Sequence, residues 1–311
     1  MSGTLRLALA GGRRHGTACL KRLLDEGVDV CAVFGYAPSP SEKEVEEPLS
    51  EVAARAKIPY HDEPDLRKKP AKDLLRKLAP DALLAVKWRR LFDKEGLEIP
   101  RQGTFIIHDS LLPHLRGAAP LNWALILGEK ETGATLFRAV EAVDAGPIAA
   151  QIRIPVTETD TAQTLEDRFV PVYAELAGRL AIGLQKGDLP LVPQDESRAT
   201  FGTWRVPEDG VIDWTWDSKR VHDFVRALAP PWPGAETRLD GKPCHVTRAS
   251  VQAASDRWVG RVVGRVVEVV KGCGVVVLAG RGTVLVEEVS LDGTLARADL
   301  LVRSLKSTFG R

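Results

Sequence analysis

The stretch GTFIIHDSLLPHLRGAAPLNW, residues 103–123, places one histidine, His108, between a short apolar run and a Ser-Leu-Leu-Pro turn. Further along, AVEAVDAGPI carries Asp144 immediately before an Ala-Gly pair. A strand that ends at a histidine, together with a later loop that delivers an aspartate, is one way in which an open α/β sheet builds an acid/base site. The two segments therefore set both a fold class and a candidate site.

Strands and helices are expected to alternate through the first half of the chain. Short, nearly all-apolar runs that predict buried strands are LRLALA (5–10), VDVCAVFGY (28–36), DALLAVKW (81–88) and TFIIH (104–108). Segments with helical apolar spacing separate them, and the longest predicted helix covers 160–184. This alternation predicts an α/β domain with a mostly parallel, doubly wound sheet. Ligands bind beyond the carboxyl ends of such strands, which is where His108 lies.

The composition changes after about residue 189. Pro190 and Pro193 are followed by a polar QDESR segment that is typical of a linker. Beyond it, GRVVGRVVEVV, GCGVVVLAG and GTVLVEEVSL predict short strands separated by glycine, as in a small barrel or open β-sheet. We therefore expect a catalytic domain over 1–190, a linker over 191–209 and a smaller β domain over 210–311.

Overall composition narrows the functional class. The 311 residues carry a formal net charge of +1, which does not support non-specific nucleic-acid binding. The four cysteines form no CxxC pair, and the beginning of the chain lacks a signal-peptide pattern. No apolar run approaches membrane-spanning length, so we expect a cytoplasmic protein with reduced thiols and no membrane association.

Several weaker motifs are better explained by structural roles than by a functional site. LAGGRRHG resembles a phosphate-binding glycine loop only loosely, and a tight turn between strand and helix with a solvated His15 is the better interpretation. His222 and His245 lack acidic or cysteine neighbours at metal-ligand spacing, which favours structural or surface roles and predicts no metal site.

His108 and Asp144 form the pair that can do chemistry. Histidine is the natural acid/base group near neutral pH, and a carboxylate beside it would hold its tautomer and stabilise the imidazolium. Spacing alone leaves a plainer interpretation ahead, in which His108 caps a strand and Asp144 closes a turn.

A resemblance to a known family favours the catalytic interpretation of His108 and Asp144 over the structural one. SLLPHLRGAAPLNWALILGEKETGATLFRAVEAVDAGPI resembles the signature region of the 10-formyltetrahydrofolate-dependent formyltransferases, which include the methionyl-tRNA and aminoarabinose sugar-nucleotide enzymes. LALAGG, DALLAVKWRRLF, GVIDW, PPWPGAET and GTVLVEEVSLDG resemble the same group, so the similarity extends over nearly the whole chain. The resemblance implies a Rossmann-like catalytic domain, a C-terminal OB-like β-barrel, and 10-formyltetrahydrofolate or a related one-carbon carrier as cofactor.

The resemblance also assigns roles to positions. It implies that His108 and Asp144 are catalytic. It implies folate contacts, many of them through the backbone, at Arg90, Leu91, Phe92, Ser110, Leu111, Leu112, Pro113, Val140, Glu141, Ala142, Val143 and Asp144.

The departure from the family pattern is Ile106, which stands where the family carries a catalytic asparagine two residues before the histidine. The asparagine amide can donate to the oxyanion of formyl transfer, and loss of one such donor typically costs about two to three orders of magnitude in rate. Three interpretations follow: a formyltransferase that uses His108 and backbone N–H groups instead, a hydrolase that releases formate, or a folate-fold protein used for another one-carbon reaction or for binding. The hydrolase domain of 10-formyltetrahydrofolate dehydrogenase is similar, and we expect it to carry isoleucine here as well.

The charge of one segment narrows the choice of molecule that could accept the formyl group. The segment PSPSEKEVEEP, residues 38–48, is acidic where methionyl-tRNA formyltransferases carry a basic loop, which argues against tRNA. APLNW and PPWPGA are most similar to the aminoarabinose enzyme, although Ala118 replaces an arginine of its R-G-R-A-P pattern. We therefore expect an amine of a small molecule or an amino sugar as acceptor, and the sequence indicates no oligomeric state.

Overall fold

The computed structural model describes residues 4–36, 47–62, 65–252 and 257–311, so most of the acidic segment 38–48 lies outside the described residues. The chain divides into two compact units. The first comprises Met1–Pro120, Glu131–Pro155 and Glu166–Thr203, and the second comprises Leu121–Lys130, Val156–Leu165 and Trp204–Arg311. The chain thus enters the second unit twice before it completes the first.

The first unit is built on a seven-stranded sheet. Its strands, in spatial order, are β3 (Tyr60–Asp62), β2 (Asp29–Gly35), β1 (Arg6–Gly11), β4 (Ala82–Val86), β5 (Thr104–His108), β7 (Glu131–Arg138) and β8 (Ile148–Pro155). The strands from β3 to β5 are parallel, and β7 pairs antiparallel with both β5 and β8. This confirms the predicted mostly parallel, doubly wound sheet, in which the strand order reverses between β1 and β4.

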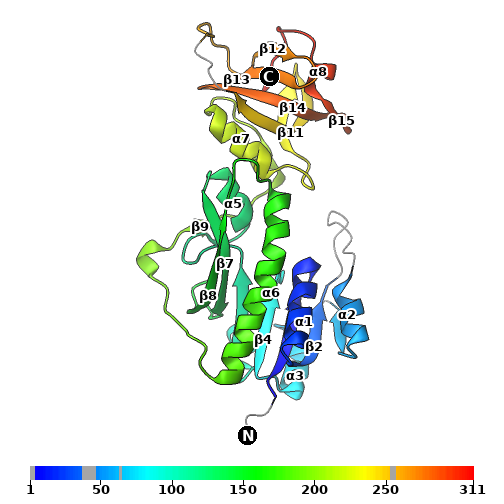
Figure 1. Ribbon diagram of the computed structural model, residues 1–311, viewed down its shortest axis with the longest axis vertical. Helices are drawn as coiled ribbons and strands as arrows, with labels where there is room; N and C mark the ends of the chain where they lie inside the picture. Colours follow the sequence, from blue (N-terminus) through cyan, green and yellow to red (C-terminus); the bar gives the residue numbers. More distant parts are fainter. Residues whose placement is uncertain (1–3, 37–46, 63–64, 253–256) are drawn as a thin grey trace. The chain divides into compact units, whose positions relative to one another are not determined.

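Helices cover this sheet because its strands are apolar on both faces. The helices are α1 (Arg13–Asp25), α2 (Leu49–Arg55), α3 (Lys69–Leu78), α4 (Lys94–Glu98) and α6 (Ala162–Lys186), of which α6 begins in the second unit. Figure 1 shows α1 and α6 side by side, and Arg22 of α1 pairs with Glu175 of α6 at 3.3 Å. One apolar cluster joins Leu75 of α3 to Phe34 and Leu83 of the sheet.

Two short strands bring a later segment back to the end of β5. β6 (Arg116–Gly117) pairs in parallel with β9 (Phe201–Gly202), and the short 3-10 helix η1 (Glu196–Arg198) precedes β9. Gly117 has a φ of 91°, and a Cβ there would lie 2.8 Å from the Gly202 oxygen, so the close approach of β6 and β9 requires glycine. The segment predicted as a linker therefore contributes to the first unit.

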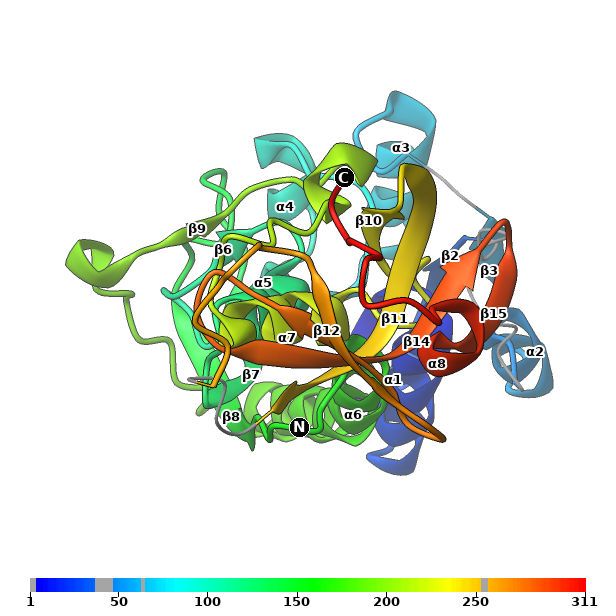
Figure 2. The same ribbon diagram turned by 90° about the horizontal axis from the view of Figure 1, so that it is seen from above.

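The second unit contains an antiparallel sheet of six strands. In spatial order they are β10 (Ala235–Leu239), β11 (Lys242–Gln252), β14 (Thr283–Leu291), β13 (Gly274–Leu278) and β12 (Val266–Val270), with β15 (Thr294–Arg297) paired to β14. The remaining elements are α5 (Pro120–Ile126), η2 (Pro207–Gly210), α7 (Ser218–Ala227) and α8 (Ala298–Leu301). Figure 2 shows the sheet from above; α7 packs against β11 and β14 over a core that includes Trp214 and Phe224. The predicted β domain is present as an antiparallel sheet, and its closure into an OB-like barrel stays a prediction.

Among the described residues, no helix combines the length and the apolar character that a membrane span requires.

Candidate active site

His108 occupies the last position of β5, at the carboxyl edge of the sheet. Its Nε2 lies 2.9 Å from the Leu115 carbonyl oxygen, and its Nδ1 lies 3.7 Å from Asp144 Oδ2. A carbonyl oxygen can only accept, so the neutral ring carries its proton on Nε2. The basic nitrogen, Nδ1, therefore faces the Asp144 carboxylate, and both side chains are about nine-tenths buried, with 11% and 12% exposed.

Asp144 is held in an unusual backbone conformation. Its φ is 52°, in the left-handed region that aspartate and asparagine tolerate better than most residues. Its Oδ2, which faces His108, accepts a hydrogen bond of 2.8 Å from the Gly117 backbone nitrogen. β6 thus places an N–H group that fixes the carboxylate, and the geometry brings the two predicted catalytic residues together.

Three further residues, Gln194, Arg116 and Glu196, form a hydrogen-bonded group that supports this pair, and the sequence analysis singled out none of them. Gln194 Nε2 donates to the Asp144 and Gly146 carbonyl oxygens, each at 2.7 Å. Gln194 Oε1 accepts from the guanidinium of Arg116, only 3% of which is exposed, and that guanidinium also binds Glu196. The hydrogen bonds that Arg116 donates to the Glu196 carboxylate raise the pKa of Arg116. Gln194 lies in the polar segment predicted as a linker, where no local pattern distinguishes it from solvated neighbours.

The Ser-Leu-Leu-Pro turn after His108 is fixed by its own hydrogen bonds. Thr135 Oγ1 donates to Ser110 O at 2.6 Å and accepts from Leu112 N at 3.1 Å, while Gln151 donates to Leu112 O at 2.8 Å. Leu111 packs against Gly133, where a Cβ would lie 2.6 Å from the leucine side chain. The Leu112–Pro113 peptide bond is cis. These contacts hold the backbone that the resemblance assigns to folate, and the folate assignment itself stays a prediction.

Ile106 lies on the same face of β5 as His108, because side chains two apart in a strand share a face. It is partly buried and packs against the apolar cluster between α3 and the sheet, as Trp88 and Phe92 also do. The position where the family carries an amide is therefore set in an apolar environment. No side-chain hydrogen-bond donor is present at this point of the strand.

A cavity of about 510 Å³ opens beside the Asp144 loop. Of the residues predicted to contact folate, Val140 and Glu141 line it; Leu97, Arg101 and Arg138 are among the other lining residues. Arg90, Leu91 and Phe92 lie outside its lining; Leu91 is 64% exposed, and the Arg90 guanidinium is 3.7 Å from Asp65. Two of the predicted folate positions thus line a cavity that includes neither His108 nor Asp144, while Arg90 and Leu91 are exposed and Phe92 is partly buried outside that cavity.

His15 corrects the sequence interpretation, which expected a solvated loop histidine. It lies inside α1, is 1% exposed and packs edge-on against the Tyr173 ring at 4.8 Å. Burial, and secondarily the charge of Lys87, lower its pKa to about 3, so the ring is neutral. The expectation was wrong because the helix begins at Arg13 and turns His15 inward, which a glycine-rich motif does not reveal.

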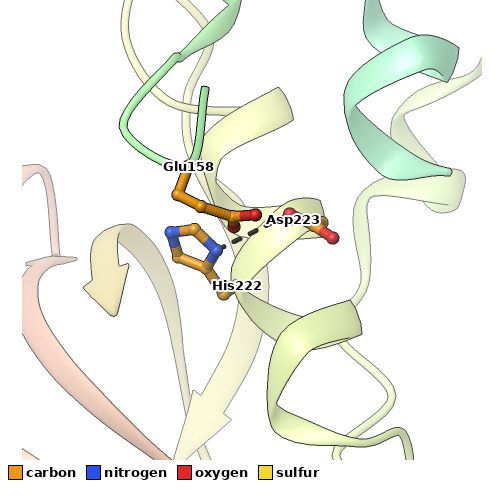
Figure 3. A group of neighbouring side chains, drawn as sticks. All are labelled: Glu158, His222 and Asp223. Carbon is orange, nitrogen blue, oxygen red and sulfur yellow. Dashed lines mark ion pairs between the residues drawn. The ribbon is translucent and has the colours of Figure 1, made fainter. Parts of the chain in front are cut away.

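The second unit contains a group of possible metal ligands, Glu158, His222 and Asp223 (Figure 3), whose ligand atoms lie within 4.8 Å of one another. Asp223 already binds Lys219 at 2.6 Å and Arg226 at 2.7 Å, and Lys219 also lies 3.6 Å from Glu158. Burial by itself raises the pKa of Asp223, but the neighbouring His222 Nδ1 at 3.6 Å, the hydrogen bond from Lys219 and the Arg226 charge bring the pKa down to about 2. The Asp223 carboxylate is thus already paired with two cations, and the three residues take part in an ion-pair network.

A doubly wound sheet with a histidine–aspartate pair at its carboxyl edge offers the groups that acid/base chemistry uses. The formyl transferase family model matches residues 6–176, and the model of the formyl transferase C-terminal domain matches residues 206–301. The chain therefore belongs to the formyl transferase family.

Solved structures share this fold at low identity. WlaRD, a sugar 3N-formyltransferase crystallised with dTDP and 5-N-formyl-THF, has a TM-score of 0.68 at 15% identity and covers 91% of this chain and 97% of its own. An N-formyltransferase from Helicobacter canadensis, in complex with folinic acid and dTDP-3-aminofucose, has a TM-score of 0.68 at 15% identity, with 91% and 99% covered. HypX from Aquifex aeolicus, in complex with tetrahydrofolic acid, has a TM-score of 0.62 at 20% identity over 97% of this chain, which spans 48% of that HypX chain.

Proposed function

We propose that this protein transfers the formyl group of 10-formyltetrahydrofolate to an amine of a small molecule or an amino sugar. The observation that carries the proposal is the His108–Asp144 pair, in which Nδ1 is the basic nitrogen and faces a carboxylate 3.7 Å away. Membership of the formyl transferase family supports the reaction class. The folates and the dTDP-linked ligands crystallised with similar enzymes support a folate donor and a small acceptor.

His108 moves the proton that the reaction requires. The amine loses one proton as its nitrogen bonds to the formyl carbon, and the nitrogen that leaves the formyl group gains one. His108 Nδ1 takes the first proton and returns it to the leaving nitrogen, so no proton is gained or lost overall. Asp144 stabilises the imidazolium between these steps, while the Leu115 carbonyl keeps Nε2 protonated throughout.

The cavity of about 510 Å³ is not part of this proposal, because neither His108 nor Asp144 lines it. Its lining includes Gly103, directly before β5, and Arg138, which pairs with Phe105 at the beginning of that strand, whereas His108 ends the strand. We place the folate at the carboxyl edge of the sheet, beside His108 and the Ser110–Pro113 turn, where doubly wound sheets bind ligands. When bound, 10-formyltetrahydrofolate supplies the formyl group and leaves as tetrahydrofolate.

Hydrolysis of 10-formyltetrahydrofolate to formate is the second candidate, and Ile106 is the observation that favours it. In that reaction water replaces the amine as the group that His108 deprotonates. Water and an amine form the same kind of tetrahedral oxyanion, so the lost amide donor affects both reactions. Isoleucine favours hydrolysis because we expect the similar hydrolase domain of 10-formyltetrahydrofolate dehydrogenase to carry it at this position as well.

The boundaries of the two domains are also part of the proposal. We place the catalytic domain over 1–190 and the smaller β domain over 210–311. The connecting segment, 191–209, then has a second role, because Gln194 supports Asp144 from within it.

One assay separates these candidates. The protein is incubated with 10-formyltetrahydrofolate, with and without amines such as dTDP-linked amino sugars, and formate, tetrahydrofolate and formyl-amine are followed. Amine-dependent release of tetrahydrofolate supports transfer, and amine-independent release with formate supports hydrolysis. Absence of turnover overturns both.

Matched variants test the assigned residue. His108→Ala is expected to abolish turnover without unfolding the protein, while His245→Ala, on β11 of the second unit, serves as the control. Turnover retained by His108→Ala refutes the role of His108.

A further inference from the structure

A buried network on the α1 and α6 side of the sheet contacts both residues that flank His108. Tyr173 of α6 is 1% exposed, and its hydroxyl lies 3.1 Å from the Ile107 carbonyl oxygen and 2.5 Å from Asp109 Oδ1. Both oxygens can only accept, so the Tyr173 hydroxyl shares its one proton between them. One acceptor is the Ile107 carbonyl, directly before His108, and the other is the Asp109 carboxylate, directly after it. One hydroxyl thus spans the position of the candidate catalytic histidine.

At its other end, the network contains an ion pair between Lys87 and two carboxylates, Asp109 and Glu166. Lys87 Nζ lies 2.5 Å from Asp109 Oδ2 and 3.1 Å from Glu166, and it sits 5.5 Å from the Tyr173 ring centre. Burial opposes ionisation of Asp109, yet the Lys87 charge holds the pKa of Asp109 below its usual value. Burial likewise lowers the pKa of Lys87, but Asp109 and Glu166 raise it overall. Both groups are therefore charged at neutral pH, as a buried pair that keeps its hydrogen bonds requires.

The network joins three elements at the carboxyl edge of the sheet. Lys87 directly follows β4 and has a φ of 51°, Asp109 directly follows β5, and Tyr173 comes from α6. The Tyr173 ring is in turn packed against His15 of α1. A rotation of the β5 end would break contacts to α6 and to the end of β4 together.

We propose that Tyr173 and Lys87 are positioning residues for His108: they fix Ile107 and Asp109, and thereby aim the ring between Leu115 and Asp144. This inference rests on the proposed function for its catalytic readout. Neither residue is assigned to substrate or to proton transfer. Their effect is on the geometry of the histidine, and a misplacement of about 1 Å can cost about a hundredfold in rate.

Tyr173→Phe tests the proposal because it removes one oxygen and keeps the buried ring. The expected result is a kcat about ten- to a hundredfold lower, with KM for the folate unchanged and a shifted pH profile of kcat. Thr17→Val is the matched control, since it removes a hydroxyl in the same unit that donates to Glu47 O at 3.1 Å. Wild-type kcat and pH profile in Tyr173→Phe would overturn the inference, as would an equal loss in Thr17→Val.

A second readout does not depend on turnover. With ¹⁵N-labelled histidine, the His108 Nε2–H signal, assigned by its loss in His108→Ala, should exchange slowly because it is bound to Leu115 O. Faster exchange is expected in Tyr173→Phe and in Lys87→Met but not in Thr17→Val. Unchanged exchange in both variants would overturn the positioning role even if the protein proves to have no formyltransferase activity, and an inactive wild type would by itself refute only the proposed function.

Discussion

Gln194 Nε2 donates hydrogen bonds of 2.7 Å to the carbonyl oxygens of Asp144 and Gly146, 50 and 48 residues earlier in the chain. The same side chain accepts from Arg116, whose neighbour Gly117 donates to the Asp144 carboxylate. The candidate catalytic aspartate is thus held by its backbone from one segment and by its side chain from another. The loop that carries it has little freedom left.

Replacement of Gln194 by leucine should therefore weaken both stability and activity. The variant leaves two carbonyl oxygens without their donor and takes from the Arg116 guanidinium one of its two acceptors, Glu196 being the other, and we expect a loss of about 1–3 kcal/mol in the free energy of unfolding. Turnover should fall further than stability explains, because the Asp144 loop is released. Urea unfolding and the folate assay measure the two effects. Gln185→Leu, which removes an exposed hydrogen bond to Glu26 O, is the control, and equal turnover in the two variants would contradict the prediction.

Substitutions at Asp144 should separate the effect of its charge on activity from the effect of its backbone conformation on stability. Asp144→Asn keeps an oxygen that can accept from Gly117 but cannot stabilise the imidazolium, so kcat should fall by about tenfold or more with little change in Tm. Asp144→Ala should be less stable than Asp144→Gly, because a φ of 52° costs alanine about 1–2 kcal/mol and glycine almost nothing. Calorimetry tests the order of the two Tm values. An alanine variant as stable as the glycine variant would show that the loop relaxes.

His15 should make the protein sensitive to acid. Its pKa is about 3 in the folded state, mainly because of burial, against about 6.5 when unfolded. Between these values the unfolded chain binds a proton that the folded chain does not, so stability is full above pH 6.5 and falls as the pH drops. From pH 7 to pH 5 the wild type should lose about 2 kcal/mol more than His15→Phe, which cannot titrate. Urea unfolding at both pH values measures this, and equal losses would mean that His15 becomes exposed.

Ile106→Asn addresses the reaction itself. The new amide restores a donor at the family position, so a formyltransferase should keep or raise its yield of formyl-amine relative to formate. The amide also enters an apolar cluster, which should cost about 1–3 kcal/mol of stability. Product analysis by chromatography gives the ratio. A collapse of all turnover in a variant that is still folded would mean that Ile106 serves a different reaction.

Much of the fold and the core of the site follow from local sequence. The apolar runs ending at Val86 and His108 predict buried parallel strands because both faces of such a sheet are covered. The segments HDSLLP and VDAG mark the ends of elements, where a doubly wound sheet gathers functional groups. The two predicted catalytic side chains do meet, 3.7 Å apart.

Other features escape local patterns. Gln194 lies in a polar, proline-flanked segment that by composition is a linker, and only the pairing of β6 with β9 brings it to Asp144. His15 follows two arginines and is expected in solvent, yet α1 turns it beneath α6. Neither position is marked by its sequence neighbours, because its partners lie more than forty residues away.

The sequence by itself determined the order of strands and helices, the histidine at the end of β5 and the aspartate in its loop, because apolar periodicity and turn residues act over a few positions. The tertiary structure alone decided which nitrogen of His108 is basic, what holds Asp144, and that Tyr173 spans Ile107 and Asp109. Those outcomes depend on hydrogen bonds between elements distant in the chain, and such bonds exist only once the order of the sheet has set which segments are neighbours.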